Sequence, residues 1–149
     1  MGKIKVLFLC VANSARSQMA EGLLRYFYGD RFEVFSAGAK ETFVHPLAIE
    51  VMREIGIDIS HHKSKLVSEF LFQSFDYVIT LCGDYSKEMC PVFIGEVKKG
   101  KLHWNFPDPV EAEGTLEEKL DFFRKVRDDI KKKIDEFVEK IASDIRRIG

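Results

Sequence analysis

The chain has 149 residues, of which 46% are hydrophobic and 32% charged, and its formal net charge at pH 7 is −1. This composition is typical of a single globular domain, here residues 1–149, and the near-neutral charge gives no reason to expect nucleic acid as a partner. No apolar run approaches the roughly 20 residues that a membrane-spanning helix requires, so we expect a cytoplasmic protein with no membrane partner.

The first predicted element is a buried strand, because residues 4–9 form a mostly apolar run. The strand ends at Cys10, and the sequence pattern becomes helical from about Ser14. Five residues separate Cys10 from Arg16, and Asn13 lies in the middle of them, where a left-handed backbone conformation is needed. A thiol and a guanidinium group therefore flank a loop between a strand and a helix.

This loop is predicted to bind a small anion. The backbone N–H groups of a loop that leads into a helix can surround an oxyanion, and the helix dipole favours negative charge there. Arg16 can clamp two oxygens of the anion, and the same field favours the thiolate of Cys10 as a nucleophile. A buried core cysteine is the alternative for Cys10. The predicted anion-binding residues are Val11, Ala12, Asn13, Ser14, Ala15, Arg16 and Ser17.

Strands and helices alternate along the rest of the chain. This alternation predicts an α/β fold in which a four-stranded parallel sheet is flanked by helices on both faces. The predicted helices cover residues 14–28, 46–55 and 115–148, with a short helix starting near residue 64 or 65, and the predicted strands after the first cover residues 32–37, 77–81 and 101–105.

The last helix has the clearest signals at its start and along one face. Thr115 and Glu118 form a capping box. An apolar stripe from Leu116 to Ile145 is expected to face the core. A helix over residues 115–148 would be about 50 Å long, so we expect a kink, fraying near the end, or a partner for the last turns.

Three side chains that can take part in chemistry follow predicted strands. Cys10 ends the first strand, Cys82 follows the third, and Asp108 comes after the fourth. Because ligands bind parallel sheets at the carboxyl ends of their strands, we expect these three residues at one edge of the sheet. Asp108 lies between two prolines, so it is either a simple turn residue or a general acid held on a stiff turn.

Four residues of the anion loop match the pattern C-x-x-N-x-x-R-S: Cys10, Asn13, Arg16 and Ser17. With them the loop resembles the signature of the low-molecular-weight protein tyrosine phosphatase fold family. The resemblance implies either phosphate ester hydrolysis or thioredoxin-coupled arsenate reduction, with Asp108 as the general acid. Phosphatases of this fold usually carry an aromatic residue after the Asp-Pro pair, and Val110 at this position argues against aryl phosphates as substrates.

The two remaining cysteines, Cys82 and Cys90, distinguish these activities. Reducing As(V) to As(III) takes two electrons, which a dithiol supplies as it becomes a disulfide, whereas a phosphatase needs one thiol. The resemblance to thioredoxin-coupled arsenate reductases implies that Cys82 attacks a Cys10–arsenic adduct and that Cys90 then attacks Cys82. Thioredoxin or a similar dithiol reductant would open the Cys82–Cys90 disulfide. Seven residues separate the two cysteines, one more than is usual in those reductases.

Several alternatives to this relay remain open at the level of sequence. Cys82 can be an inert cysteine at a strand end, or Cys82 and Cys90 can form a structural disulfide, as in some thermophilic proteins. The chain can also be a phosphatase of the same fold, or an oxyanion-binding protein without catalytic activity. We predict an arsenate reductase that acts on arsenate, with the catalytic residues Cys10, Arg16, Cys82, Cys90 and Asp108.

Neither a cofactor nor a metal site is predicted. The four histidines show no zinc-binding spacing with the cysteines. Some related reductases bind potassium beside the loop through residues that resemble Asn13, Glu21 and Ser36, and through an aspartate. Lys65 stands at the position of that aspartate. Its ammonium group can replace the cation, so we expect no potassium dependence.

Overall fold

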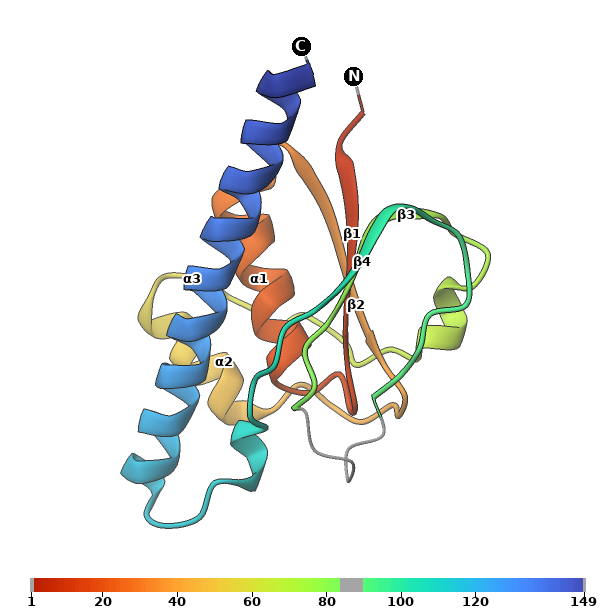
Figure 1. Cartoon of the computed structure of the whole chain (residues 1–149). Helices are drawn as coiled ribbons and strands as arrows, with labels where there is room; N and C mark the ends of the chain where they lie inside the picture. The colour runs from red at the N-terminus through yellow and green to blue at the C-terminus, as the bar shows by residue number, and fades with distance from the viewer. Residues whose placement is uncertain (1, 84–89, 149) are drawn as a thin grey trace.

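The computed structural model describes residues 2–83 and 90–148. The four strands form one parallel sheet in the order β2-β1-β3-β4 (Figure 1). The predicted α/β fold is therefore confirmed. In chain order the elements are β1 (Ile4–Cys10), α1 (Arg16–Tyr28), β2 (Phe32–Gly38), α2 (Pro46–Glu54), the 3-10 helix η1 (Val67–Phe70), β3 (Phe75–Thr80), β4 (Val97–His103), the 3-10 helix η2 (Pro109–Glu111) and α3 (Leu116–Ile148).

The side chains of β1 alternate between two hydrophobic clusters on opposite faces of the sheet. Val6 and Phe8 pack with the buried side chains of α1, α2 and α3. Leu7 and Leu9 belong to a smaller cluster that includes Phe70 of η1. Helices thus cover both faces, as predicted. Among the described residues, the three α-helices lie on one face and the short η1 lies on the other (Figure 1).

The carboxyl ends of β1 and β3 lie side by side. Leu9 pairs with Thr80 across the two strands, and the backbone N–H of Leu81 donates to the Leu9 carbonyl at 2.8 Å. Cys10 and Cys82 directly follow Leu9 and Leu81 in the chain. The sheet therefore brings these two cysteines to neighbouring positions at one edge.

The starts of the α-helices differ in how their first backbone N–H groups are satisfied. His45 caps α2, because its Nδ1 accepts the backbone N–H two residues further on at 3.1 Å. Thr115 and Glu118 form the predicted capping box of α3, with reciprocal hydrogen bonds of 3.1 Å. Ala15, at the start of α1, makes no side-chain cap. Helix α1 thus begins with backbone N–H groups that its N-cap side chain does not satisfy.

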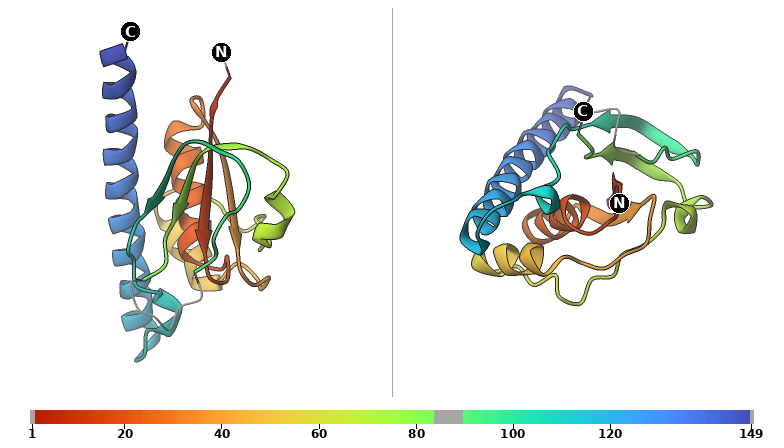
Figure 2. Two further views of the ribbon diagram at one scale, coloured as in Figure 1. Left: turned by 45° about the vertical axis from the view of Figure 1, so that its right-hand side comes forward. Right: turned by 90° about the horizontal axis from the view of Figure 1, so that it is seen from below.

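Helix α3 is longer than the core that it covers. Figure 2 shows it as one straight helix that extends past the sheet, so the expected kink is not present. Most of its apolar stripe is buried, but Leu116 and Ile145 at the two ends are 64% and 55% exposed. The prediction that the whole stripe faces the core was wrong at both ends. Among the described residues, no helix is both long enough and apolar enough to cross a bilayer.

Several boundaries differ from the sequence predictions. β3 covers Phe75–Thr80 rather than residues 77–81. β4 begins at Val97 rather than at residue 101 and ends at His103 rather than at residue 105. Lys98 and Lys99 disfavoured a strand in the sequence, but β4 is the edge strand beyond β3, where exposed lysines are common. The short helix after α2 begins at Val67, slightly later than predicted, and is a 3-10 helix.

Candidate active site

The loop between β1 and α1 has the features of an anion-binding site. Asn13 has a φ angle of 47°, in the left-handed region that the sequence predicted. The backbone N–H groups of residues 11–15 donate no hydrogen bond to any described residue, and they lead directly into the uncapped start of α1. These donors are therefore available to an anion at the positive end of the helix.

Buried polar side chains hold this loop from behind. Asn13 Nδ2 donates to Ser17 Oγ at 2.7 Å and to Ser36 Oγ at 3.0 Å. Asn13 Oδ1 accepts from Gln18 Nε2 at 2.9 Å and from the backbone N–H of Lys65 at 2.8 Å. Asn13, Ser17, Gln18 and Ser36 are all buried. These hydrogen bonds fix the left-handed turn and with it the direction of the loop amides.

Cys10 lies at the end of β1 as a free, buried thiol. Its sulfur is 2.8 Å from the hydroxyl oxygen of Ser17, a contact that holds the sulfur in a defined direction. The hydroxyl of Ser17 also accepts from Asn13, so Ser17 links the thiol to the hydrogen bonds that shape the loop.

Arg16 and Asp108 meet at the mouth of the loop. The Arg16 guanidinium group is buried, and its NH1 donates to the carbonyl oxygens of Phe106 at 3.0 Å and Leu81 at 3.4 Å. Its NH2 lies 3.6 Å from Asp108 Oδ2. Asp108 also accepts the backbone N–H of Val110 at 3.0 Å, and its side chain is 25% exposed. The turn between the two prolines thus holds this carboxyl group beside Arg16.

A cavity of about 200 Å³ joins the predicted catalytic groups of the loop to Asp108. Of the predicted anion-binding residues, Val11, Asn13 and Ser17 do not line it. Asn13 and Ser17 support the loop from behind, as described above. The lining residues are Cys10, Ala12, Ser14, Ala15, Arg16, Thr42, Phe43, His45, Asp108 and Val110.

The segment before α2 provides a wall of the cavity that the sequence analysis missed. Thr42, Phe43 and His45 line the cavity, and Phe43 is 64% exposed. The backbone N–H of His45 donates to the Ser14 carbonyl at 3.0 Å, which ties the start of α2 to the anion loop. In the sequence, the His-Pro pair indicated only a helix start. Phe43 gives the cavity an aromatic wall although Val110 replaces the aromatic residue expected after the Asp-Pro pair.

Cys82 and Cys90 form a disulfide bond, with their Cα atoms 5.8 Å apart. Cys82 is fully buried where the chain leaves β3, whereas Cys90 is partly exposed. Residues 84–89, which carry most of the unusual spacing between the two cysteines, lie outside the described residues. The structure therefore brings Cys10, Arg16, Asp108 and the Cys82–Cys90 pair to the same edge of the sheet.

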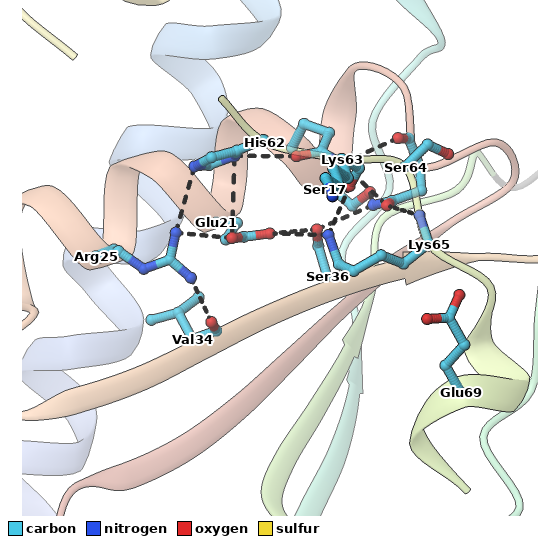
Figure 3. A network of polar contacts seen from close by, with 12 residues as sticks. Ser17, Glu21, Arg25, Val34, Ser36, His62, Lys63, Ser64, Lys65 and Glu69 are labelled. Atoms are coloured by element: carbon cyan, nitrogen blue, oxygen red, sulfur yellow. Dashed lines mark hydrogen bonds and ion pairs between the residues drawn. The ribbon is translucent and has the colours of Figure 1, made fainter. Parts of the chain in front are cut away.

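Glu21 lies behind the loop and is surrounded by nitrogen-bearing side chains (Figure 3). Its carboxylate lies 2.7 Å from Arg25, 3.9 Å from Lys65 Nζ and 3.9 Å from His62 Nδ1, and it accepts the hydroxyl of Ser36. Burial lowers the pKa of Lys65, and Glu21 opposes this shift. The Lys65 ammonium group thus lies near Glu21, one of the residues that resemble the potassium ligands, and Glu21 in turn accepts the hydroxyl of Ser36. Among the described residues, no group of three or more His, Cys, Asp or Glu side chains is arranged to hold a metal ion.

Residues 5–147 match the family described as low molecular weight phosphotyrosine protein phosphatase. The chain belongs to this family. The family match spans the anion loop, both paired cysteines and Asp108. It confirms the resemblance that the loop residues had indicated.

Within the low molecular weight phosphatase family, the chain is similar to proteins named for a redox activity. It is 47% identical over 139 residues to an arsenate reductase of Halalkalibacterium halodurans, over 93% of this chain and 98% of the relative. A solved structure of an arsenate reductase in a phosphate-binding state superimposes with a TM-score of 0.77 at 35% identity, over 93% of this chain and 98% of that chain. A thioredoxin-dependent arsenate reductase of Corynebacterium glutamicum gives a TM-score of 0.71 at 31% identity, over 95% of this chain and 63% of that chain.

Proposed function

We propose that this protein is an arsenate reductase that uses the thiols of Cys10, Cys82 and Cys90 in turn. The observation that carries the proposal is the Cys82–Cys90 disulfide, which starts beside the strand that ends in the free thiol of Cys10. Phosphate ester hydrolysis has no use for a disulfide, whereas a two-electron reduction by thiols produces one. The names of the relatives and of the similar solved structures support the same activity.

The anion loop and Asp108 carry out the first chemical step. Arsenate binds to the backbone N–H groups of residues 11–15 and to Arg16, which neutralise its charge. The sulfur of Cys10 attacks arsenic, and one oxygen leaves as water after taking a proton from Asp108. The product is a covalent Cys10–arsenic(V) adduct. The contact between Arg16 and Asp108 keeps the clamp and the acid on the same side of the substrate.

The second step transfers two electrons to arsenic. Cys82 attacks the sulfur of Cys10, and the electron pair of the broken sulfur–arsenic bond stays on arsenic, which leaves as arsenite. Cys90 then attacks Cys82, which frees the thiol of Cys10 and gives the Cys82–Cys90 disulfide found in the structure. Summed over the cycle, arsenate and two thiols give arsenite, one disulfide and water.

A dithiol reductant must open the Cys82–Cys90 disulfide before the next turnover. We take this reductant to be thioredoxin, which is supported by the similar thioredoxin-dependent arsenate reductase. Because the cycle returns to free thiols, the protein is suited to a reducing compartment, and we place it in the cytoplasm. The family match over residues 5–147 supports treating residues 1–149 as one domain.

Phosphate monoester hydrolysis at the same loop is the second candidate function. It is favoured by the family match and by the aromatic wall that Phe43 adds to the cavity. Hydrolysis requires Cys10, Arg16 and Asp108 but neither of the other cysteines. The two functions therefore differ in their need for Cys82.

The variant Cys82→Ser separates the two functions. With thioredoxin as the reductant, we expect the wild type to form arsenite over many turnovers and Cys82→Ser to form none. Hydrolysis of p-nitrophenyl phosphate, where the wild type shows it, should continue at the wild-type rate in Cys82→Ser. Cys10→Ser serves as the control, since it should abolish both reactions. Sustained arsenite formation by Cys82→Ser, or none by the wild type, would contradict the proposed function.

A further inference from the structure

Two hydroxyl groups from outside the anion loop hold the carbonyl of Ala12. Thr42 Oγ1 donates to the Ala12 oxygen at 2.9 Å, and Ser64 Oγ donates to the same oxygen at 3.1 Å. Thr42 Oγ1 also lies 3.4 Å from the Phe43 carbonyl, but a hydroxyl has one proton to donate, and the Ala12 oxygen is closer. Among the described residues, no backbone N–H group donates to the Ala12 carbonyl. We call Thr42 and Ser64 the hydroxyl clamp.

Two other carbonyl groups of the loop are held by the backbone alone. The Val11 carbonyl accepts the backbone N–H groups of Ala39 and Lys40, and the Ser14 carbonyl accepts that of His45. Every residue except proline can supply such a donor. At the hydroxyl clamp, in contrast, side chains outside the loop decide which way a peptide of the loop points.

The two residues of the hydroxyl clamp also hold each other. The backbone N–H of Thr42 donates to Ser64 Oγ at 2.9 Å, so the Ser64 hydroxyl accepts one hydrogen bond and donates another. Ser64 is 8% exposed, whereas Thr42 is exposed at the cavity wall. The next residue, Lys65, donates its backbone N–H to Asn13 Oδ1 at 2.8 Å. The segment of Ser64 and Lys65 thus contacts the residues on both sides of the peptide that joins Ala12 to Asn13.

This peptide is planar, and it links the Ala12 carbonyl to the N–H of Asn13. The two groups of a trans peptide point in opposite directions, so a carbonyl held outside the loop directs the N–H of Asn13 towards the anion site. Asn13 has a φ angle of 47°, which is uncommon for a residue other than glycine. Rotation of the peptide would give Asn13 a negative φ, turn its N–H away and aim the Ala12 oxygen at the bound anion.

We propose that Thr42 and Ser64 are positioning residues, which keep the N–H of Asn13 aimed at the oxyanion by holding the Ala12 carbonyl away from it. A peptide N–H stabilises the negative charge of a tetrahedral oxyanion, whereas a peptide oxygen repels it. Neither hydroxyl has to touch the substrate for this role. The proposal rests on the proposed function where it names arsenate as the oxyanion.

Isosteric replacement of Thr42 tests the exposed half of the clamp. Thr42→Val removes the hydroxyl and keeps the shape of the side chain, whereas Thr42→Ser keeps the hydroxyl. We expect Thr42→Val to weaken the binding of inorganic phosphate about threefold to tenfold in calorimetry, because a hydrogen bond of this kind changes an equilibrium by about that factor. Thr42→Ser should restore most of the phosphate affinity.

Ser64→Ala tests the buried half of the clamp. The change removes a donor to Ala12 and also leaves the Thr42 N–H without its acceptor, so we expect phosphate affinity to fall about tenfold. The matched control is Ser60→Ala, which changes an exposed serine of the same segment that contacts Asp58, and it should bind phosphate like the wild type. An unfolded fraction would lower the number of binding sites rather than their affinity, so the calorimetric stoichiometry separates misfolding from loss of the clamp.

The direction of the Asn13 N–H can be followed by NMR. Phosphate should move the Asn13 amide proton of the wild type downfield, because this N–H donates to the anion. The double variant Thr42→Val, Ser64→Ala should lose most of this shift. The amide of Ala15 is the internal control, since the carbonyl before it is held by a backbone N–H, and it should still respond to phosphate in the double variant.

The outcomes separate the hydroxyl clamp from the proposed function. Phosphate binding needs no thiol chemistry, so a loss in Thr42→Val that Thr42→Ser reverses supports the clamp even if the wild type forms no arsenite. If Thr42→Val binds phosphate as tightly as Thr42→Ser, or if the amides of Asn13 and Ala15 lose their response together, the clamp is wrong while the reductase proposal stands. Weak phosphate binding by Thr42→Val with an undiminished kcat/KM for arsenate would also contradict the clamp.

Discussion

Gly38 shows how tightly the anion loop is held by its neighbours. This glycine ends β2, and a Cβ atom at its position would meet Asn13 N at 2.7 Å and Val11 O at 2.9 Å. The Val11 carbonyl also accepts the backbone N–H groups of Ala39 and Lys40, at 2.8 and 3.0 Å. The end of β2 therefore supports the backbone of the loop directly, and any side chain at Gly38 must displace it.

The variant Gly38→Ala should impair oxyanion binding because it pushes the loop amides out of position. A displacement of about 1 Å can cost about 100-fold in activity, and we expect a loss of that order in arsenite formation together with weaker phosphate binding by calorimetry. Gly100→Ala is the matched control, since a Cβ atom there would only touch the Tyr77 ring at 3.8 Å. Equal phosphate affinity in the two variants would show that Gly38 does not position the loop.

The burial of His62 makes the free energy of unfolding depend on pH. Its side chain is 6% exposed, and its Nδ1 lies 3.0 Å from Gln18 Oε1. Burial lowers the pKa of His62 in the folded state, although the Glu21 carboxylate opposes this effect. The pKa of His45 is lowered in the same direction, again mainly by burial. In the unfolded chain both histidines titrate near the ordinary value of about 6.5.

We therefore expect the free energy of unfolding to fall as the pH is lowered through about 6.5 towards 5. In that window the unfolded chain binds protons that the folded protein does not yet accept, so acid favours unfolding. His62→Gln should reduce this pH dependence in urea titrations, because the glutamine does not titrate. A full pH dependence in His62→Gln would exclude this role.

The sequence predicted the residues with a fixed spacing better than those that meet only in space. Cys10, Arg16 and Asp108 line one cavity, and they could be selected from the sequence because the loop and the proline pair have recognisable patterns. Phe43 and His45 were missed as cavity residues, because they lie in an irregular segment that has no periodicity. The cavity wall they form depends on the contact of His45 with Ser14, which no local pattern encodes.

An arginine of α3 connects this helix to the end of α2 through hydrogen bonds. Arg127 of α3 has a side chain that is 9% exposed, and its NH1 donates to the Val51 carbonyl at 2.7 Å and lies 3.0 Å from Glu54. Val51 is one of the last residues of α2, where carbonyl groups have no partner within the helix. Arg124 also pairs with Glu54, at 2.7 Å, but it is more exposed.

Arg127→Ala should lower the free energy of unfolding by about 1–3 kcal/mol, because it leaves a buried carbonyl without its donor. Arg124→Ala should have a smaller effect, since exposed ion pairs contribute little. Urea unfolding of the two variants under the same conditions checks the difference. A larger loss in Arg124→Ala would mean that the Glu54 ion pairs, and not the bond to Val51, join these helices.

Element types were predictable from periodicity, whereas two details depended on the surroundings. β4 was placed too late because Lys98 and Lys99 look unlike a buried strand, yet an edge strand tolerates them. The ends of the α3 stripe were expected to be buried, but the sheet is shorter than the helix (Figure 2). Periodicity indicates which side of a helix faces the core but does not indicate how far the core extends.

At the scale of the whole molecule, the parallel sheet gathers the redox groups at one edge. Cys10 ends β1 and Cys82 follows the neighbouring β3, so two cysteines from distant parts of the chain lie at neighbouring positions beside the anion loop. The order of strands that produces this meeting was not predicted from the sequence, which gave only the alternation of elements. The disulfide partner of Cys82 is Cys90, which leaves Cys10 free for the next substrate.

The most direct test of the relay is a single turnover of the pre-reduced Cys90→Ser variant with arsenate. Without Cys90, the disulfide between Cys10 and Cys82 has no internal thiol to resolve it. We predict one arsenite released per protein molecule and accumulation of a Cys10–Cys82 disulfide, identified by mass spectrometry of the digested protein. Many thioredoxin-driven turnovers by this variant, or arsenite release without any Cys10–Cys82 species, would contradict the three-cysteine relay.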